Sequence, residues 1–399
     1  MKFSVLLPTR NRLQYLKHAL YSVLEQDEDD VEIIISDNNS EEDIASYVRS
    51  LNEPKIKYYR TDRFVSVTEN WNLSMNYSSG DWIIMLGDDD CLMKGYFKTI
   101  RKITADHPSA DFIYSRGFLY AYPNVLPGSE NGRTIVLGNA NFFKDGEIAA
   151  RIPPKKALNL VKKSFNFVLE FTFNMQFATM NRVFVDSLKK DGDFFHSPYP
   201  DYYAMNMMMY FGKNIISCSH PIVAVGICPK SFGYYYFNNI EQQGVEFLNN
   251  SKETVCSEEV RKILLPGTQM NSSWLLSMHE IKKRFIEFRW PLNIRRYRLL
   301  QAAHVFIQYQ ETNRIKELWH SLSISERLIF AISYCFSKLP KPLNLVTKIY
   351  SVIIRKVLSP YLFHKTITIS REYKNIQELF NDVDPINYSD FNDPKHRVK

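Results

Sequence analysis

The sequence contains little that would mark a secreted or membrane-spanning protein. Its five cysteines are odd in number, widely spaced and without a C-x-x-C pair, which excludes a disulfide framework and a cysteine zinc site. The apolar segment after Met1, FSVLLP, is only six residues long, so no signal peptide is expected. The longest charge-free windows, such as residues 214–229, are shorter than the roughly 18–20 residues of a membrane-spanning helix. These absences predict a cytoplasmic protein.

Charge is unevenly distributed along the 399 residues. Residues 261–399 hold 23 Lys and Arg against 11 Asp and Glu, which leaves residues 1–260 net acidic, and residues 281–371 alone hold 17 basic against 4 acidic side chains. An anionic partner is therefore expected for the basic part only. Length and the change to a helical, basic pattern predict two parts, a domain at 1–250 and a region at 251–399.

Strand and helix patterns alternate through residues 1–90. Short apolar runs of the buried-strand type are followed by apolar residues at helical spacings of three and four. The runs lie at residues 3–8, 31–36, 56–60 and 82–86. This alternation predicts right-handed crossovers and a parallel α/β sheet. Polar clusters follow three strands, at 9–12, 37–40 and 88–90, and because such sheets bind ligands outside the carboxyl ends of their strands, all three are expected on one rim.

The later patterns are less regular. Residues 112–122 alternate as a strand, residues 140–152 are expected to form a loop, and the aromatic run at 165–177 is expected in the core. Residues 193–201 are typical of a proline-rich loop that leads into a helix at 202–211.

Three consecutive carboxylates, Asp88, Asp89 and Asp90, follow a buried strand. Such like charges repel, and a fold tolerates them there mainly when a divalent cation offsets them. Mg²⁺ and Mn²⁺ bind one or two carboxylates together with substrate phosphates, so the triplet predicts a metal and nucleotide-diphosphate site. The alternative is a solvated acidic turn.

Two further clusters offer groups that suit a nucleotide. Asp37 is a candidate acceptor for a ribose hydroxyl or a base N–H, the alternative being an Asx turn or a helix cap. Residues 9–12, Thr-Arg-Asn-Arg, place hydroxyl, amide and guanidinium groups at the start of a helix, which favours phosphate. An ordinary polar loop would give the same composition.

The order and spacing of these segments resemble glycosyltransferase family 2, inverting transferases of GT-A fold that use nucleotide-diphosphate sugars. VLLPTRNR resembles the family's first strand and turn, IIISDNNSEED its second-strand signature, and NWNLSMNYSSGDWIIMLGDDD its helix, Gly-Asp, strand and D-x-D triplet. Asn38 departs from the family, in which many members have a second Asp. The resemblance implies a Rossmann-like mixed, mainly parallel sheet flanked by helices.

The resemblance also implies residue roles. The nucleotide sugar, with UDP as the expected nucleotide, would contact Pro8, Thr9, Arg10, Arg12, Asp37, Asn39, Asp88 and Asp89. A Mn²⁺ or Mg²⁺ ion on the diphosphate would be held by Asp90 and Asp88, although the triplet allows two registers.

An inverting transfer needs a general base that takes the proton from the acceptor hydroxyl. In the family this base is an Asp or Glu at the start of a helix, roughly a hundred residues after the metal motif. Asp201, 111 residues after Asp90, matches that context. An N-cap role is the alternative for Asp201, and Asp191 and Asp193 are competing carboxylates.

Weaker signals lie further along the chain. Residues 230–234, KSFGY, resemble a loop that closes over donor or acceptor, or an ordinary turn. His196 and His220 are candidates for a third metal ligand or for structural histidines. Residues 343–358 form an amphipathic pattern with a basic face and residues 284–300 a second basic cluster, which predict peripheral contact with an anionic membrane, or else helices packed as core.

The sequence thus predicts a cytoplasmic inverting glycosyltransferase, peripheral on the inner face of the membrane. It would transfer a sugar to a hydroxyl of a glycan acceptor, lipid-linked, in bacterial surface polysaccharide synthesis, with no nucleic acid partner and with a homo-oligomer as a further possibility. One alternative is a nucleotidyltransferase, which the absence of glycine from VLLPTRNR disfavours. The other is a non-catalytic glycan-binding or assembly protein on the same fold.

Overall fold

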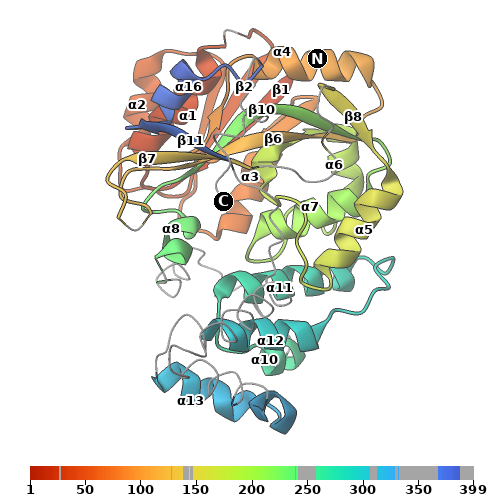
Figure 1. Ribbon diagram of the computed structural model, residues 1–399. Helices are drawn as coiled ribbons and strands as arrows, with labels where there is room; N and C mark the ends of the chain where they lie inside the picture. The colour runs from red at the N-terminus through yellow and green to blue at the C-terminus, as the bar shows by residue number, and fades with distance from the viewer. Residues whose placement is uncertain are drawn as a thin grey trace.

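The computed structural model describes residues 1–26, 28–126, 128–137, 143, 147–238, 240, 258–305, 312–328, 331 and 367–386. In these residues a mixed sheet of 11 strands carries helices on both faces (Figure 1), which confirms the predicted α/β class. The path through the sheet runs β11-β7-β6-β9-β4-β1-β2-β3, and β10 joins it beside β6.

The N-terminal part of the sheet is parallel, as the alternating pattern predicts. Its strands are β1 (Phe3–Thr9), β2 (Val31–Asp37), β3 (Ile56–Arg60) and β4 (Trp82–Met85). Its connecting helices are α1 (Leu13–Leu24), α2 (Ile44–Leu51) and α3 (Val67–Asn76). The first strand lies between β2 and β4, and the side chains of all three are almost entirely buried because helices cover both faces of the sheet.

Most of the remaining strands add to the sheet in antiparallel pairs, although β10 runs parallel to β6. They are β5 (Cys91–Leu92), β6 (Phe112–Ala121), β7 (Gly132–Leu137), β8 (Ala149–Ile152), β9 (Ala178–Asn181), β10 (Ile215–Ile227) and β11 (Ile367–Tyr373). The prediction of a loop over 140–152 is wrong at its end, since β8 pairs with the first residues of β10. That pairing joins segments more than sixty residues apart, which local sequence does not reveal.

Further helices and one aromatic segment pack around the sheet. The helices are α4 (Tyr96–Asp106), α5 (Pro154–Ser164), the 3₁₀ turn η1 (Met175–Phe177), α6 (Arg182–Leu188), α7 (Pro200–Phe211) and α8 (Phe232–Phe237). In Figure 1, α4 lies at the top of the view, and α5, α7 and α8 lie below the strands. The aromatic run at 165–177 lies in the core as predicted, with every second side chain buried.

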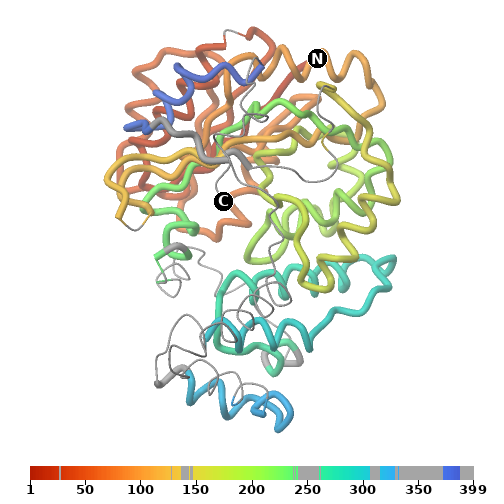
Figure 2. Tube along the Cα trace, viewed as in Figure 1, coloured from red at the N-terminus to blue at the C-terminus, as the bar shows by residue number. Residues whose placement is uncertain are grey.

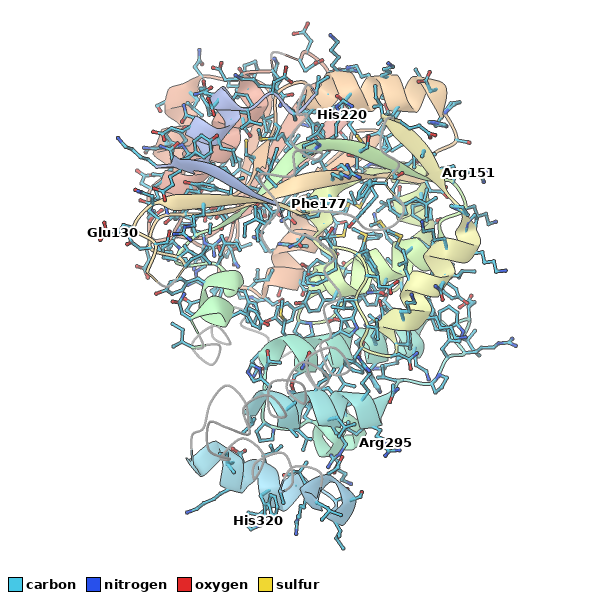
Figure 3. All side chains as sticks on the ribbon, in the orientation of Figure 1. Glu130, Arg151, Phe177, His220, Arg295 and His320 are labelled. Carbon is cyan, nitrogen blue, oxygen red and sulfur yellow. The ribbon has the colours of Figure 1, made fainter. Side chains whose placement is uncertain are left out.

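Four described helices follow the sheet domain, in agreement with the helical pattern. They are α10 (Glu258–Ile263), α11 (Gln269–Arg284), α12 (Ile294–His304) and α13 (Thr312–Ser321). In Figure 1, α11 packs under α7, and α12 and α13 lie successively farther from the sheet. Arg298 of the basic cluster is ion-paired with Glu326 at 2.9 Å, whereas Arg295 is exposed on α12 (Figure 3). The amphipathic segment 343–358 lies outside the described residues, and no described helix is long and apolar enough to cross a membrane.

The chain then returns to the sheet, which the prediction of a helical C-terminal region did not include. Strand β11 pairs with β7, and α16 (Ile376–Asp382) packs against α1, so that blue and red segments lie together in Figure 2. Ile376 and Leu379 are fully buried in a cluster that also contains Cys91 and Tyr122, next to the Asp88–Asp90 triplet. We name residues 367–382 the C-terminal strap.

Replacing Leu379 by Ala should lower the free energy of unfolding by about 2–5 kcal/mol, because the cluster cannot close the cavity that is left. Urea unfolding of the full chain measures this loss. Ile324→Ala is the control, since Ile324 is 85% exposed and its truncation should have almost no effect. Equal stability of the two variants would mean that the strap does not pack as described.

Candidate functional site

Three strand ends form the floor of the candidate site. Thr9 at the end of β1 is in parallel register with Asp37 at the end of β2. The loop after β4 reaches the same rim, where the Thr9 hydroxyl donates a hydrogen bond of 2.7 Å to Asp88 Oδ2. The structure therefore brings together the three polar clusters that the sequence placed on one edge.

A buried arginine pairs with two carboxylates at the centre of the site. Arg12 Nη1 lies 2.9 Å from Asp88 Oδ1 and 3.6 Å from Asp89 Oδ1, and the three side chains are 8%, 4% and 9% exposed. Burial alone would lower the pKa of Arg12, but the nearby carboxylates outweigh it and raise this pKa above its ordinary value. Burial raises the pKa of Asp88, and the guanidinium of Arg12 opposes that rise. Arg12 is thus the internal counter-charge of the site.

Asp90 is bound to backbone instead. Its two carboxylate oxygens accept hydrogen bonds of 2.7 Å from the N–H groups of Gly87 and Gly226. Burial, with the charge of Asp89, raises the pKa of Asp90 well above its ordinary value. A Cβ at Gly226 would lie 1.7 Å from the carbonyl oxygen of Asp89, so only glycine lets β10 approach the triplet this closely. The role of Asp90 in the structure is to hold the loop against β10.

The segment after β10 lies across the charged cluster. Asp89 Oδ2 accepts hydrogen bonds from Cys228 N at 3.2 Å and from the hydroxyl of Ser231. Arg12 donates a hydrogen bond to the carbonyl oxygen of Lys230, the first residue of the predicted closing loop. The loop before α8 is therefore hydrogen-bonded both to Arg12, through Lys230, and to Asp89, through Ser231.

A cavity of about 590 Å³ opens over the strand ends. It is lined by Pro8, Thr9, Arg10, Asn11, Arg12, Asn38, Phe64, Val67, Asn70, Trp71, Gly87, Asp88, Asp89, Gln176, Lys230 and Tyr235. Six of the predicted donor-binding residues are among them, whereas Asp37, Asn39, Asp90 and Asp201 are not. The sequence analysis missed Phe64, Trp71, Gln176 and Tyr235. Only Trp71 had a visible signal, since Val67, Asn70 and Trp71 recur at the three- and four-residue spacing of one helix face.

Both carboxylate oxygens of Asp37 accept hydrogen bonds from groups within the protein. Its Oδ2 accepts a hydrogen bond of 2.6 Å from the Tyr58 hydroxyl and its Oδ1 one of 2.9 Å from Ser40 N, which is the Asx-turn alternative. Burial, with the Asp37 carboxylate next to it, raises the pKa of Tyr58. Asn39 lies in the same turn, at a φ of 52°, and its Oδ1 accepts from Arg60.

The next turn residue, Asn38, holds the aromatic wall of the cavity. Its side chain donates to the carbonyl oxygen of Val65 at 2.9 Å and accepts from Val65 N at 2.8 Å. Phe64 is thereby held beside the strand ends, and the Arg10 guanidinium lies 3.3 Å from the centre of its ring. An aromatic ring stacked on a cation at this end of the cavity suits a planar base.

Asp201 lies in the first turn of α7, directly after Pro200 at the helix start. It is partly buried, and its Oδ1 accepts from Tyr202 N at 3.0 Å. Burial raises the pKa of Asp201 to about 7. The ring of Tyr199, just before α7, packs against the ring of Phe232, with 4.9 Å between the ring centroids. This contact joins the start of the helix to the loop that covers Asp89.

The competing candidates are placed differently. Asp191 is exposed and ion-paired with Arg284 at 2.6 Å, and Asp193 forms a backbone bridge with Lys190. Burial lowers the pKa of both His196 and His220. Among the described residues no group of three or more His, Cys, Asp or Glu side chains is arranged to hold a metal ion.

Comparisons with known proteins agree with this architecture. Residues 4–148 match the family model "Glycosyl transferase family 2". A GalNAc(5)-diNAcBac-PP-undecaprenol beta-1,3-glucosyltransferase from Campylobacter jejuni is 30% identical over 153 residues, 38% of this chain and 46% of that protein. A PGL/p-HBAD biosynthesis glycosyltransferase from Mycobacterium bovis is 29% identical over 119 residues, 28% of this chain and 45% of that protein. The chain thus spans about half the length of these curated relatives.

Among solved structures, TarS from S. aureus in complex with UDP-GlcNAc aligns with a TM-score of 0.44 and 14% identity, over 80% of this chain and 90% of that one. The segment that matches the family model, residues 4–148, contains β1 from its second residue and β2 to β7, with the strand ends and all three carboxylates. The match of residues 4–148 to the glycosyltransferase family 2 model confirms the resemblance seen in the sequence.

Arg12→Gln should lower the free energy of unfolding at neutral pH by about 3–5 kcal/mol, because it leaves two buried carboxylates without their counter-charge. The deficit should shrink as the pH falls, since a protonated carboxyl needs no counter-charge. Urea unfolding from pH 4 to pH 8 measures both effects. Arg63→Gln, which removes an exposed pair with Glu69, is the control and should change little. A deficit of constant size at every pH would contradict the role given to Arg12.

Proposed function

We propose that the protein is an inverting glycosyltransferase that moves a sugar from a UDP-sugar to a hydroxyl of a glycan acceptor. The observation that carries this proposal is the cavity over three strand ends, which combines a cation stacked on an aromatic ring, an Arg12–Asp88–Asp89 cluster and Lys230. Cations and carboxylates in one polar cavity suit a ligand that carries both phosphates and hydroxyls. Surface polysaccharide or glycolipid synthesis in bacteria is the proposed setting, and it is supported by bacterial relatives that are named for a PP-undecaprenol-linked substrate and for PGL/p-HBAD biosynthesis.

The order of the cavity lining suggests how a donor would lie. Arg10 and Phe64 would hold the base at the β2 end, and Arg12 and Lys230 would face the diphosphate in the middle. Asp37 and Asn39 act in this proposal through the turn that positions Asn38, not by contact with the donor.

Two of the three carboxylates offer oxygen atoms that fit a divalent cation. Asp88 and Asp89 line the cavity and offer the hard oxygen ligands that Mg²⁺ and Mn²⁺ prefer, whereas Asp90 is not part of the cavity lining. We therefore assign metal binding to Asp88 and Asp89, in place of the Asp90 and Asp88 pair expected from the sequence. Such an ion would stabilise the negative charge of the departing diphosphate.

Asp201 is the proposed general base. Its carboxylate would accept the proton of the acceptor hydroxyl while the oxygen attacks the anomeric carbon, and the bond from that carbon to the diphosphate oxygen would break on the opposite side. A pKa near 7 matches this role, because the group is then basic enough to take the proton yet largely ionised at slightly alkaline pH.

The C-terminal region would bring this site to its acceptor. The Campylobacter relative is named for a PP-undecaprenol-linked substrate, and we extend a lipid-linked acceptor to this chain as a proposal. The excess of basic residues after position 261, with Arg295 exposed on α12, supports peripheral contact with the anionic inner face of the cell membrane.

Thermal unfolding with UDP and UDP-sugars, with and without Mn²⁺, tests donor binding. A ligand at about one hundred times its Kd should add about 2.7 kcal/mol to the free energy of unfolding, and Mn²⁺ should increase the shift. Asp89→Asn should remove the Mn²⁺ effect, and Asp106→Asn, an exposed carboxylate at the end of α4, should keep it. Stabilisation by no nucleotide would contradict the function, and Mn²⁺-independent stabilisation would contradict the metal assignment alone.

Asp201→Asn should lower the rate of sugar transfer by a factor of about 10²–10⁴ while donor binding stays unchanged, because the amide cannot take the proton. In the unmodified protein the rate should rise with pH through about 7, as Asp201 ionises. Initial rates from pH 5 to pH 9 measure both. Asp191→Asn is the matched control and should transfer normally.

The pH dependence of stability provides a second test of the raised pKa of Asp201. The folded-state pKa of Asp201 is raised, so the unmodified protein should lose stability as the pH rises from about 4 to about 7, and Asp201→Asn should not share that part of the loss.

Near-normal turnover of Asp201→Asn would exclude Asp201 as the base.

A further inference from the structure

Gln176 is among the polar side chains of the cavity that have no role in the proposal so far. Gln176 is the middle residue of η1, and it lines the cavity with Asp88 and Asp89. Its Oε1 is buried and has no hydrogen-bond partner among the described residues. A buried carbonyl oxygen without a donor costs free energy, which is recovered when a ligand supplies one.

The position of Gln176 is set by its two neighbours. Met175 and Phe177 are 0% and 1% exposed, so the turn is held by the core on both sides of the glutamine. Phe177 lies in the interior below the sheet (Figure 3), where a Cβ on Gly117 would come within 2.2 Å of its ring. Only glycine at 117 leaves room for that ring, and the close packing keeps η1 in place.

The sheet order shows which part of a donor Gln176 would meet. Directly after η1 comes β9, and the strands then follow in the order β9-β4-β1-β2. The cavity lining follows the same order, from Gln176 through the carboxylates after β4 and the turn after β1 to Asn38 after β2. Strands are about 4.8 Å apart, so three spacings place Gln176 roughly 14 Å from the proposed base end. Gln176 lies beyond the carboxylates assigned to the diphosphate, where the sugar would be.

The same end of the cavity is connected to the proposed general base. The ring of Phe173, three residues before Gln176, packs against the ring of Tyr202, with 4.3 Å between the ring centroids. Tyr202 follows Asp201 in α7. Gln176 is therefore linked through Phe173 and Tyr202 to the helix turn that carries Asp201. An amide there can accept a hydrogen bond from one sugar hydroxyl and donate one to another.

We propose that Gln176 is a specificity-determining residue that accepts a hydrogen bond from a hydroxyl of the transferred sugar. This inference rests on the proposed function and extends it to the choice of sugar. Sites that hydrogen-bond a substrate hydroxyl reject analogues that lack it, because the buried group is then left without a partner. Gln176 thus discriminates between sugars and contributes little to binding of the nucleotide.

The test compares two ligands on the full chain. Gln176→Met keeps the size of the side chain and removes the amide. By titration calorimetry with Mn²⁺, it should weaken binding of the UDP-sugar by about three- to tenfold and leave binding of UDP within about twofold. Candidate donors are UDP-glucose, UDP-galactose and UDP-N-acetylglucosamine. The control is Gln14→Met, at an exposed position of α1 outside the cavity lining, which should bind both ligands normally.

Deoxy analogues of the sugar identify the hydroxyl. One of them should bind Gln176→Met and the unmodified protein equally, because the contact is already missing from the ligand. Equal loss of UDP and UDP-sugar binding would show a structural role and overturn the inference, as would unchanged binding of both. If no UDP-sugar binds the unmodified protein, the proposed function itself fails, and the two failures are therefore distinct.

Discussion

The buried contact of Arg12 with Asp88 and Asp89 is the interaction on which the site depends. Two adjacent carboxylates that are 4% and 9% exposed stay together only if a cation offsets them, and Arg12 is that cation. The contact joins the turn after β1 to the loop after β4, and through the carbonyl of Lys230 it reaches the segment before α8. Three parts of the chain that form the cavity are thus held by one guanidinium, and a ligand that competes for the carboxylates acts on all three.

The triplet also shows how environment separates identical residues. Asp88 is held by Thr9 and Arg12, Asp89 by Ser231 and Cys228, and Asp90 by two backbone N–H groups. A run of three aspartates gives no sign of this division, because five of the six partners come from residues 226–231 or from β1 and its turn, far away in sequence. Sequence alone therefore left the register of metal binding open, and the proposed choice of Asp88 and Asp89 rests on their place in the cavity lining, which does not include Asp90.

The sequence predicted local features such as strands and helices well, and it missed contacts between residues that are far apart in the chain. Apolar runs and helical spacings located β1 to β4 and α1 to α3, and since parallel strands end on one rim, the positions of Thr9, Arg12 and Asp88 followed. Asp37 was different: its Asx turn with Ser40 was one of the alternatives read from the sequence, but its contact with Tyr58 of another strand was not visible there. Gln176 carried no signal at all, since its place in the cavity depends on the pairing of β9 with β4.

Charge along the chain suggested two consecutive parts, and the C-terminal strap changes their relation. The chain leaves the sheet after α8, contributes α10 to α13 and comes back to pair with β7, so the helical region is held by the sheet domain on both sides. The strap carries Tyr373 and Leu379 into the cluster that contains Tyr122, whose hydroxyl donates to the carbonyl oxygen of Asp89. Packing at the C-terminal end of the described chain therefore supports the backbone of the charged loop.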